Sequence, residues 1–239
     1  MSNPLIGKLE KLDRLNAEER SVLESFTSPD REVGQDEDIV RQGAAPRHST
    51  LLLEGIAGRY KVLGSGQRQI TALHISGDFV DLHSFLLARM DHAIIALTPC
   101  KVAAVPHDTL RQVTERHPHL GRVLWLTTLI DGSIHREWLV AMGRRTALAH
   151  TAHLFCEMFL RFKLIGAVDG YTFKLPLTQE EMADTLGLSH VHVNRTLGEL
   201  RDAGLLKWRR QLVTIYDWDR LTDVAEFDPT YLNLQGKPL

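Results

Sequence analysis

Short apolar runs separated by glycine fill the region from Asp36 to Val105. They include DIVRQG, STLLLEGIAGRYKVL, QITALHISGDFV and AIIALTPCKVAAV. Runs of this length, rich in β-branched residues and bounded by turn residues, are typical of antiparallel strands in a small sandwich or roll. Gly64 and Gly66 in LGSGQRQI favour a hairpin, because glycine readily adopts the positive φ angles of tight turns. We therefore predict that this region is an antiparallel β-roll.

After His107 the spacing of apolar residues becomes helical. Pro118 suits the first turn of a helix that runs to about Gly143. One set of side chains recurs every three or four residues along it: Leu120, Val123, Leu124, Thr127, Ile130, Ile134 and Trp138. A second set, Leu126, Leu129, Leu139 and Met142, broadens the apolar surface, which suits a helix that packs on its own domain and on a partner helix. We expect a homodimer formed through this helix, with the first set in the contact.

A second helix is predicted from about Thr146 to Leu164, with the domain boundary near residues 143–145. The segment GAVDGYTFKLPLT that follows predicts a loop with one strand. Thr178 and Glu181 then form a capping box, so that a helix begins at about Gln179. Gly187 lies where the chain must turn, and Ser189 is suited to cap the next helix. This pattern predicts a helix-turn-helix.

The second of these helices has two different sides. Val193, Leu197 and Leu200 fall on one stripe and supply the core between the helices. The opposite stripe is formed by Val191, Asn194, Arg195 and Gly198. In a DNA major groove, arginine pairs with guanine or phosphate, asparagine pairs with adenine, and valine contacts the thymine methyl group. His190 and His192 lie in the first turn, where free N–H groups attract phosphate.

The segment RDAGLLKWRRQLVTIYDW has the order expected of a wing, namely a helix end at Gly204, a strand, a basic turn and a strand. The lysine and arginine side chains of this turn are suited to bind DNA phosphates. A helical hairpin whose polar residues merely face water is the alternative interpretation of the two helices. The residues predicted to bind DNA are Thr178, Gln179, Ser189, His190, Val191, His192, Asn194, Arg195, Lys207, Arg209 and Arg210.

Composition narrows the class of protein. The chain has 239 residues, 24% of them charged, and a net charge of −2, so any nucleic-acid affinity must come from a local basic patch. Two cysteines are too few for a disulfide framework or for an iron–sulfur cluster held by about four thiolates. The sequence has no apolar run of about 18 residues and no signal peptide, which favours a cytoplasmic protein without a membrane partner. A glycine-rich phosphate loop, a nucleophile elbow and a HExxH pair are also missing, so we do not expect an enzyme.

The order of β-roll, long helix and winged helix-turn-helix resembles the Crp–Fnr family of transcription regulators. DIVRQG, LLLEGIAGRYKV and HISGDFV resemble segments of its cyclic-nucleotide-binding roll, and LTQEEMADTLGLSHVHVNRTLGELRDAGLL is similar to its DNA-binding signature. The resemblance implies an α+β fold with a sensor roll at 1–116, a dimerisation helix at 117–143 and a winged helix-turn-helix at 144–239 that includes a C-terminal tail. It also implies a homodimer that binds double-stranded DNA and acts on RNA polymerase.

Two departures from the family pattern affect the expected function. In cyclic-AMP-responsive members, GDF is followed by Gly-Glu-Leu, whose glutamate binds the ribose, and later by Arg-Ser, whose arginine binds the cyclic phosphate. At the corresponding places this chain has GDFVDLHSF and RMDHAI. Asp91 at the matching position would repel a phosphodiester, so we expect another signal. The residues expected around the pocket are Asp81, Leu82, His83, Ser84, Arg89, Asp91 and His92. Val191 replaces a glutamate that reads cytosine in many members, so a different DNA sequence is expected.

The histidines leave one alternative open. His74, His83 and His92 lie near the expected pocket, and His150, His153 and Cys156 have a spacing near that of metal ligands on one helix. Ordinary packed positions explain the same residues, and Cys100 is interpreted as a small buried hydrophobic residue. No cofactor is required by the sequence. We therefore expect a regulator that senses an unidentified signal, and the alternative is a haem or small-molecule sensor that acts through protein contacts.

Overall fold

The computed structural model describes residues 3–28 and 30–234, which pack into two compact units. The first unit contains residues up to Gln67 and from Thr71 to Gly132, and the second contains Arg68 to Ile70, at the start of one strand of the roll, and Ser133 to Leu232. The division therefore falls inside the long helix, whereas the sequence placed it near residues 143–145. Residues 235–239 of the predicted C-terminal tail lie outside the described residues. The predicted α+β class is confirmed.

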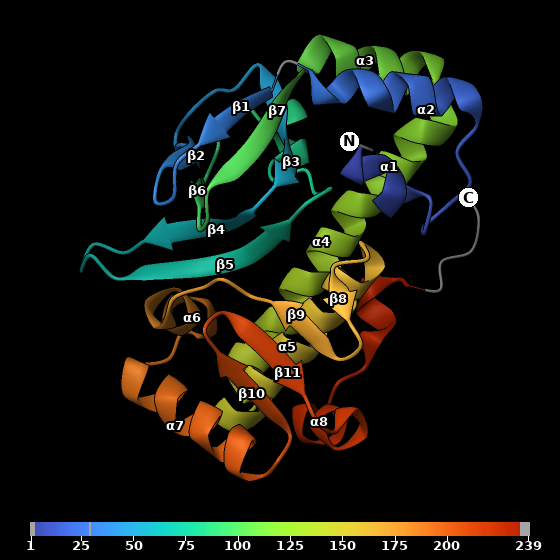
Figure 1. Cartoon of the computed structure of the whole chain (residues 1–239). Helices are drawn as coiled ribbons and strands as arrows, with labels where there is room; N and C mark the ends of the chain where they lie inside the picture. The colour runs from blue at the N-terminus through green and yellow to red at the C-terminus, as the bar shows by residue number, and fades with distance from the viewer. Residues whose placement is uncertain (1–2, 29, 235–239) are drawn as a thin grey trace. The chain divides into compact units, whose positions relative to one another are not determined.

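The strands of the first unit form the predicted antiparallel roll, drawn in blue to green in Figure 1. One sheet has the order β1-β7-β3, and the other has the order β2-β6-β4-β5. The strands are β1 (Asp30–Val33), β2 (Asp38–Val40), β3 (His48–Glu54), β4 (Ile56–Val62), β5 (Arg68–Ile75), β6 (Ala93–Ala96) and β7 (Cys100–Pro106). The predicted hairpin joins β4 to β5, where the Leu63 N–H donates to the Gln67 carbonyl at 2.9 Å and Gly66 has a φ of 86°.

Strand β3 is apolar on both of its faces. Leu52 packs in the interior of the roll with Ile94 and Val102, whereas Leu51 packs with Leu110 and other residues of the helices beside the roll. Successive side chains of a strand point to opposite faces, so a strand buried on both sides needs a continuous apolar run. This explains the sequence TLLLE, in which polar residues do not alternate with apolar ones.

Short helices that the sequence pattern did not predict cover one side of the roll. They are α1 (Pro4–Leu9), α2 (Ala17–Glu24), η1 (Ser25–Thr27), η2 (Leu82–Phe85) and α3 (His107–Arg116). The start of α2 did carry a signal, because Asn16 and Glu19 form a capping box. Helix α1 lies so close to Gly77 that a Cβ atom there would be 2.8 Å from the Pro4 carbonyl oxygen.

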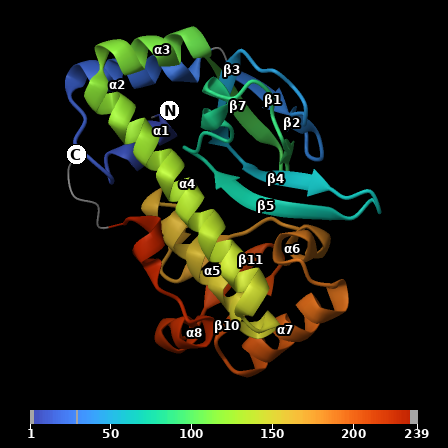
Figure 2. The ribbon, with the colours of Figure 1, turned by 180° about the vertical axis from the view of Figure 1, so that it is seen from behind.

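Helix α4 (Pro118–Arg144) is one uninterrupted helix (Figure 2). It has two different apolar sides. The residues that the sequence placed in a dimer contact lie instead inside the single chain: Leu120, Val123, Leu124, Ile134 and Trp138 are buried, and Thr127 and Ile130 are partly buried. The apolar side chains exposed on α4 are Trp125, Leu129, Leu139, Val140 and Met142. Periodicity identified an apolar stripe but could not tell which stripe the chain covers itself.

The second unit combines helices with a four-stranded sheet of order β10-β11-β9-β8. Its elements are α5 (Ala147–Leu164), β8 (Val168–Asp169), β9 (Thr172–Lys174), α6 (Gln179–Leu186), α7 (His190–Asp202), β10 (Leu206–Arg209), β11 (Leu212–Ile215), α8 (Trp218–Ala225) and η3 (Pro229–Leu232). The loop predicted between α5 and α6 thus contains two strands rather than one. Helix α5 is buried over most of its length, so it forms the centre of the unit.

A buried carboxylate joins three parts of this unit. Glu157 of α5 accepts hydrogen bonds from Trp138 Nε1 at 2.9 Å, from Arg161 at 3.1 Å and from the Tyr231 hydroxyl at 3.0 Å. Nearby, Glu137 pairs with Arg145 at 2.5 Å, and Trp138 lies in the core.

His119, in the first turn of α4, bridges two buried carboxylates of the N-terminal segment. Its Nδ1 atom lies 2.7 Å from Glu19 Oε1, and its Nε2 atom lies 3.2 Å from Asp13 Oδ2. Both ring nitrogens donate at the same time only in the protonated imidazolium form. The hydrogen bond to Glu19 raises the pKa of His119, burial opposes the rise, and the hydrogen bond to Asp13 adds to it.

The bridge makes stability depend on pH. Because folding raises the pKa of His119, the bridge contributes fully to the free energy of unfolding below the unfolded-state pKa of about 6.5. This contribution is lost as the pH rises through the folded-state pKa. We expect His119→Gln to lower the free energy of unfolding by about 1–3 kcal/mol at low pH, and the difference from wild type to shrink at high pH. Urea denaturation of wild type and variant between about pH 5.5 and pH 9 measures the difference in unfolding free energy and its dependence on pH.

His190→Gln is the control, because His190 is an exposed histidine of the second unit. Its unfolding free energy is expected to follow that of wild type at every pH. A difference between wild type and His119→Gln that is constant with pH would contradict the assignment of a protonated bridge.

Candidate functional site

Helix α7 presents a polar stripe to solvent and an apolar stripe to its own unit. Val193 and Leu200 are completely buried, whereas Asn194 and Arg195 are exposed and Val191 is 76% exposed. A valine that is this exposed has no packing role inside the chain. The predicted division of the helix holds for these residues, whereas Leu197 and Gly198 are both partly buried.

Local sequence signals fix the ends of the two helices. Thr178 and Glu181 exchange hydrogen bonds in a capping box at the start of α6. Gly187 ends α6 with a φ of 63°, in the left-handed region that favours glycine. The Ser189 side chain then accepts a hydrogen bond from the His192 N–H at 3.3 Å, which caps α7. Thr178, Gln179, Ser189, His190 and His192 are all exposed at these helix starts.

Arg195 is held only loosely inside the chain. Its Nε atom lies 3.6 Å from Glu199 Oε1, one turn further along α7, and both side chains are about half exposed or more. An exposed pair of this kind contributes about 0–1 kcal/mol, so the guanidinium group is free to exchange Glu199 for another acceptor. The sequence interpretation did not include Glu199.

A threonine pair fastens α7 to α5. Thr196 is buried, and its hydroxyl lies 3.3 Å from the hydroxyl of Thr151 while it donates to backbone carbonyls of its own helix. Each hydroxyl also donates to a carbonyl of its own helix, so the pair is a close buried polar contact between the two helices. The spacing of residues gave no signal for it, because the two threonines are far apart in the sequence.

The predicted wing is the hairpin of β10 and β11. Arg210 and Gln211 at its tip have φ angles of 52° and 66°, which is the backbone of a two-residue hairpin turn. Arg209 and Arg210 are exposed, and Lys207 is partly buried. The wing is anchored by Trp208, which packs on Phe155 of α5 and donates to the Leu175 carbonyl at 3.2 Å.

The roll contains a group of polar side chains around Arg59 of β4. Arg59 is buried and donates to Asp131 of α4 at 3.0 Å. The rings of His83 and His92 lie 5.1 Å apart, and their Nε2 atoms are buried without a hydrogen-bond partner among the described residues. Burial and the nearby Arg59 lower the pKa of both histidines, that of His83 to about 4, so both rings are neutral at pH 7.

The other residues expected around the pocket have different roles. Asp81 and Ser84 hold η2 to β3, Asp81 by accepting from the Thr50 N–H and Ser84 through Ser49. Leu82 packs in the core beside the roll, and Arg89 is exposed and donates to the Gly43 carbonyl. Asp91 is also exposed and pairs with His92 and Lys61, so it does not face the interior of the roll. Sequence reasoning missed Arg59 and Asp131, which only the fold brings together.

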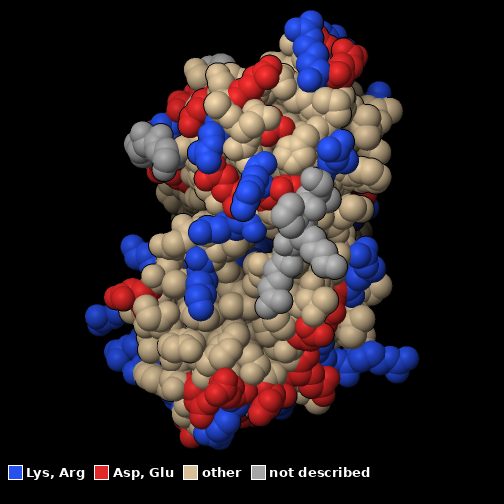
Figure 3. All heavy atoms as spheres, turned by 90° about the vertical axis from the view of Figure 1, so that its right-hand side faces the viewer, with Lys and Arg blue, Asp and Glu red and all other residues tan. Residues whose placement is uncertain are grey.

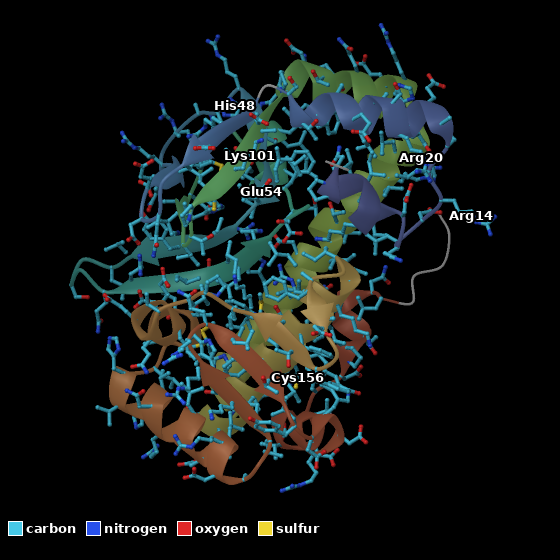
Figure 4. All side chains as sticks on the ribbon, in the orientation of Figure 1. Arg14, Arg20, His48, Glu54, Lys101 and Cys156 are labelled. Atoms are coloured by element: carbon cyan, nitrogen blue, oxygen red, sulfur yellow. The ribbon has the colours of Figure 1, made fainter. Side chains whose placement is uncertain are left out.

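The histidine and cysteine spacings do not form a metal site. Within residues 3–28 and 30–234, no group of three or more potential ligands is placed to hold a metal ion. His153 stacks on Tyr231 with ring centroids 5.8 Å apart, and burial lowers the pKa of His153 to about 3. Cys156 lies inside the second unit (Figure 4), and burial raises the pKa of its thiol, as it does for Cys100.

The described helices also include none that is both long enough and apolar enough to cross a membrane.

Two family models match the chain, one in each of the regions described above. Residues 30–117 match the cyclic nucleotide-binding domain, and residues 149–224 match the Crp-like helix-turn-helix domain. The first match covers the roll and α3, and the second covers the segment from α5 to α8.

Relatives match along most of the chain. It is 28% identical over 219 residues to the transcriptional activator protein FnrL of Cereibacter sphaeroides, which covers 90% of this chain and 87% of that protein. It is 22% identical to the fumarate and nitrate reduction regulatory protein of Escherichia coli K12, with 88% and 84% covered. The structure of FixK2 from Bradyrhizobium japonicum has a similar fold, with a TM-score of 0.74, 24% identity and coverage of 82% of this chain and 96% of that one.

The two domains occur in one chain, and these regulators match most of its length. They confirm the resemblance that the sequence motifs indicated. The protein belongs to the Crp–Fnr family and is a transcription regulator with a DNA-binding helix-turn-helix and a cyclic-nucleotide-binding-like sensory domain.

Proposed function

We propose that this regulator binds a pseudo-palindromic DNA site as a homodimer and reads each half-site with the exposed side of α7. The observation that carries the proposal is the outward stripe of Val191, Asn194 and Arg195, which the helix does not use for packing. The two half-sites would lie about one helical turn, or roughly 34 Å, apart.

Each side chain of this stripe suits a different base edge. Arginine donates two hydrogen bonds to guanine, asparagine both donates to and accepts from adenine, and valine contacts the thymine methyl group. The exposed caps and histidines at the starts of α6 and α7 are placed for phosphates, because the first N–H groups of a helix attract anions. Base contacts determine which DNA sequence is bound, and phosphate contacts fix the position of the protein on the duplex.

Replacement of Arg195 tests the base-reading role. Duplexes recovered from random sequence by selection with the full chain provide the probes, and fluorescence anisotropy gives Kd. We expect Arg195→Ala to weaken binding by about 1–3 kcal/mol, roughly 5- to 150-fold, because a bidentate base contact is lost. A second selection with the variant is expected to show a relaxed preference at one base pair in each half-site.

Arg201→Ala is the matched control. Arg201 is an exposed arginine in the last turn of the same helix and pairs with Asp202 at 2.9 Å. We expect this variant to keep the wild-type Kd and preference. If the two variants behave alike, α7 does not read DNA through Arg195.

The homodimer is proposed to form through the exposed apolar stripe of α4. Trp125, Leu129, Leu139 and Val140 are each about half exposed or more, and helical spacing places all four on the side opposite the buried stripe. Apolar residues at this spacing on a long helix are typical of a seam between two helices. The contact therefore uses a different set of residues from the set expected from periodicity.

Charged residues in this stripe are expected to separate the protomers without unfolding them. Leu129→Asp combined with Leu139→Asp places carboxylates in the seam, where burial without a partner is unfavourable. Sedimentation equilibrium is expected to give twice the chain mass of 27.0 kDa for wild type and the single mass for the variant. Leu86→Asp is the control, since Leu86 is 82% exposed on a loop of the roll. If the double variant is still a dimer, the two protomers contact each other through other residues.

The signal is proposed to act on the roll and to differ from a cyclic nucleotide. A cyclic phosphodiester needs an uncompensated cation, but Asp131 neutralises Arg59 and both nearby histidines are neutral. The free Nε2 atom of His92, whose Nδ1 atom pairs with Asp91, suits a ligand that donates a hydrogen bond. Action on RNA polymerase rests on the family resemblance alone and stays a prediction.

Cyclic AMP is therefore expected to leave the protein unchanged. A ligand that binds only the folded state raises the melting temperature in proportion to the logarithm of its concentration above Kd. We expect no shift in a thermal melt with millimolar cyclic AMP, and DNA from the selection provides the positive control. A saturable rise in Tm would contradict the assignment of a compensated Arg59.

A further inference from the structure

Arg59 is a charged side chain in the interior of the roll. It follows Ala57 by two residues on β4, and alternate residues of a strand point to the same face. Ala57 packs inside the roll with Leu52 and Ile94, and strand register places Arg59 opposite Ile94. The Arg59 side chain is only 9% exposed. A guanidinium group in such a position needs an anion beside it.

Charged side chains at the surface do not have this requirement. Basic and acidic side chains adjoin one another over the upper part of the surface in Figure 3, where water solvates them. Lys61 and Asp91 of the roll form such a pair, and both side chains are half exposed or more. An exposed pair contributes little to stability. The anion beside Arg59 therefore has a larger effect on the roll than a surface pair has.

The anion beside Arg59 comes from α4. Arg59 donates to Asp131 at 3.0 Å, although the two residues are 72 positions apart. Both belong to the first compact unit. Asp131 lies four residues after Thr127 and three before Ile134, on the stripe of α4 that the chain buries. The stripe is otherwise mainly apolar, so the carboxylate at this position is explained by Arg59 and not by helix packing.

Two other carboxyl groups near Arg59 do not supply the compensating charge. Asp91 is exposed and pairs with His92. Asp81 is completely buried, and burial raises the pKa of its carboxyl group to about 7, so much of it is uncharged at neutral pH. Among these three carboxyl groups, Asp131 is the one that compensates the charge of Arg59.

We propose that Asp131 is a built-in substitute for an anionic ligand of the roll. Residues 30–117 match the cyclic nucleotide-binding domain, and cyclic nucleotides are anions. In this chain the interior cation of that domain is satisfied by a carboxylate of the chain itself. The carboxylate is tethered through α4, so its effective concentration at Arg59 is far above that of a free anion. The roll is thereby held to the first half of α4 without a small-molecule anion.

This inference deepens the proposed regulation, and its DNA readout rests on the proposed DNA binding. The charge requirement of the roll is met before any signal arrives. A signal therefore acts on a contact that already exists. Anionic ligands are the class that the roll excludes, because Asp131 occupies the place of their charge. The protein is expected to bind DNA without any added anionic ligand.

Replacement of the carboxylate by a small free anion tests the inference. Asp131→Ala leaves Arg59 without its anion and leaves room beside it. The Asp131 side chain is 31% exposed, so a small carboxylate can reach the guanidinium group from solvent. Formate is the probe. Sodium formate replaces sodium chloride at a constant total of about 0.2 M, which keeps the screening of charges the same. Thermal melts and fluorescence anisotropy with the selected duplex are the two readouts.

Three further variants make the test specific. Asp131→Ser keeps a hydroxyl acceptor near Arg59, so its melts decide the question if Asp131→Ala does not fold. Asp131→Ala combined with Arg59→Gln removes both charges and with them the anion site. Asp108→Ala is the matched control, because Asp108 is an exposed aspartate of the same unit that pairs with Arg111 at 2.6 Å.

We expect Asp131→Ala to lower Tm by about 5 °C relative to wild type in chloride, because a buried charge loses its partner. Formate is expected to restore about half of this loss or more along a saturable curve, since a ligand that binds only the folded state raises Tm. Affinity for the duplex should fall roughly 10-fold in chloride and recover in formate. Relative to wild type in the same salt, Asp108→Ala and the double variant should not respond to formate.

Three outcomes would overturn the inference. If Asp131→Ala melts like Asp108→Ala, the pair does not hold the roll to α4. If both Asp131 variants lose stability and formate restores neither, Arg59 is not an anion site. If Asp131→Ala binds the duplex as tightly as wild type, the pair has no effect on DNA binding. When wild type itself does not bind the duplex, the proposed DNA binding fails, and the melts still decide whether Arg59 takes an anion.

Discussion

The organisation of the second unit depends on the buried carboxylate of Glu157. Burial raises the pKa of this carboxyl group, while the charge of Arg161 and the hydrogen bond from Trp138 oppose the rise. A buried carboxylate is tolerated only when all of its donors are in place. Those donors come from α4, α5 and η3, so one arrangement of the three elements satisfies the group. Helix α7 contacts the same α5 through Thr151 and Thr196. Helix α7 and the end of α4 are therefore both packed on one common helix.

The helix-turn-helix could be predicted from sequence because its signals are local. The capping box of Thr178 and Glu181, the left-handed Gly187 and the Ser189 cap each involve residues within a few positions of one another, and all three occur in the structure. The strands of the roll were predictable for a similar reason, since glycines mark their ends. The N-terminal helices were missed although Asn16 and Glu19 carried the same capping signal. Short helices that depend on packing for stability give a weak periodic pattern.

Contacts between distant parts of the chain could not be predicted. Arg59 and Asp131 are 72 residues apart, and His119 meets carboxylates about 100 residues earlier. Sequence periodicity reports that a helix has an apolar stripe, but it does not say which neighbour covers the stripe. This explains why Leu120 and Trp138 were assigned to a dimer contact although the chain buries them itself.

Net charge is a poor guide to what this protein binds, because charge is unevenly distributed within the second unit. Lys207, Arg209 and Arg210 of the wing have no carboxylate within 4 Å among the described residues, whereas Asp219, Asp223 and Glu226 are exposed on α8 and beside it. A polyanion responds to the local potential within about one Debye length, roughly 8–10 Å, and not to the sum over the chain. An overall negative protein can therefore attract DNA to one face and repel it from another. In the proposed function, such a distribution would restrict the orientation of the duplex before any base is read, and Val191, Asn194 and Arg195 would then determine the sequence.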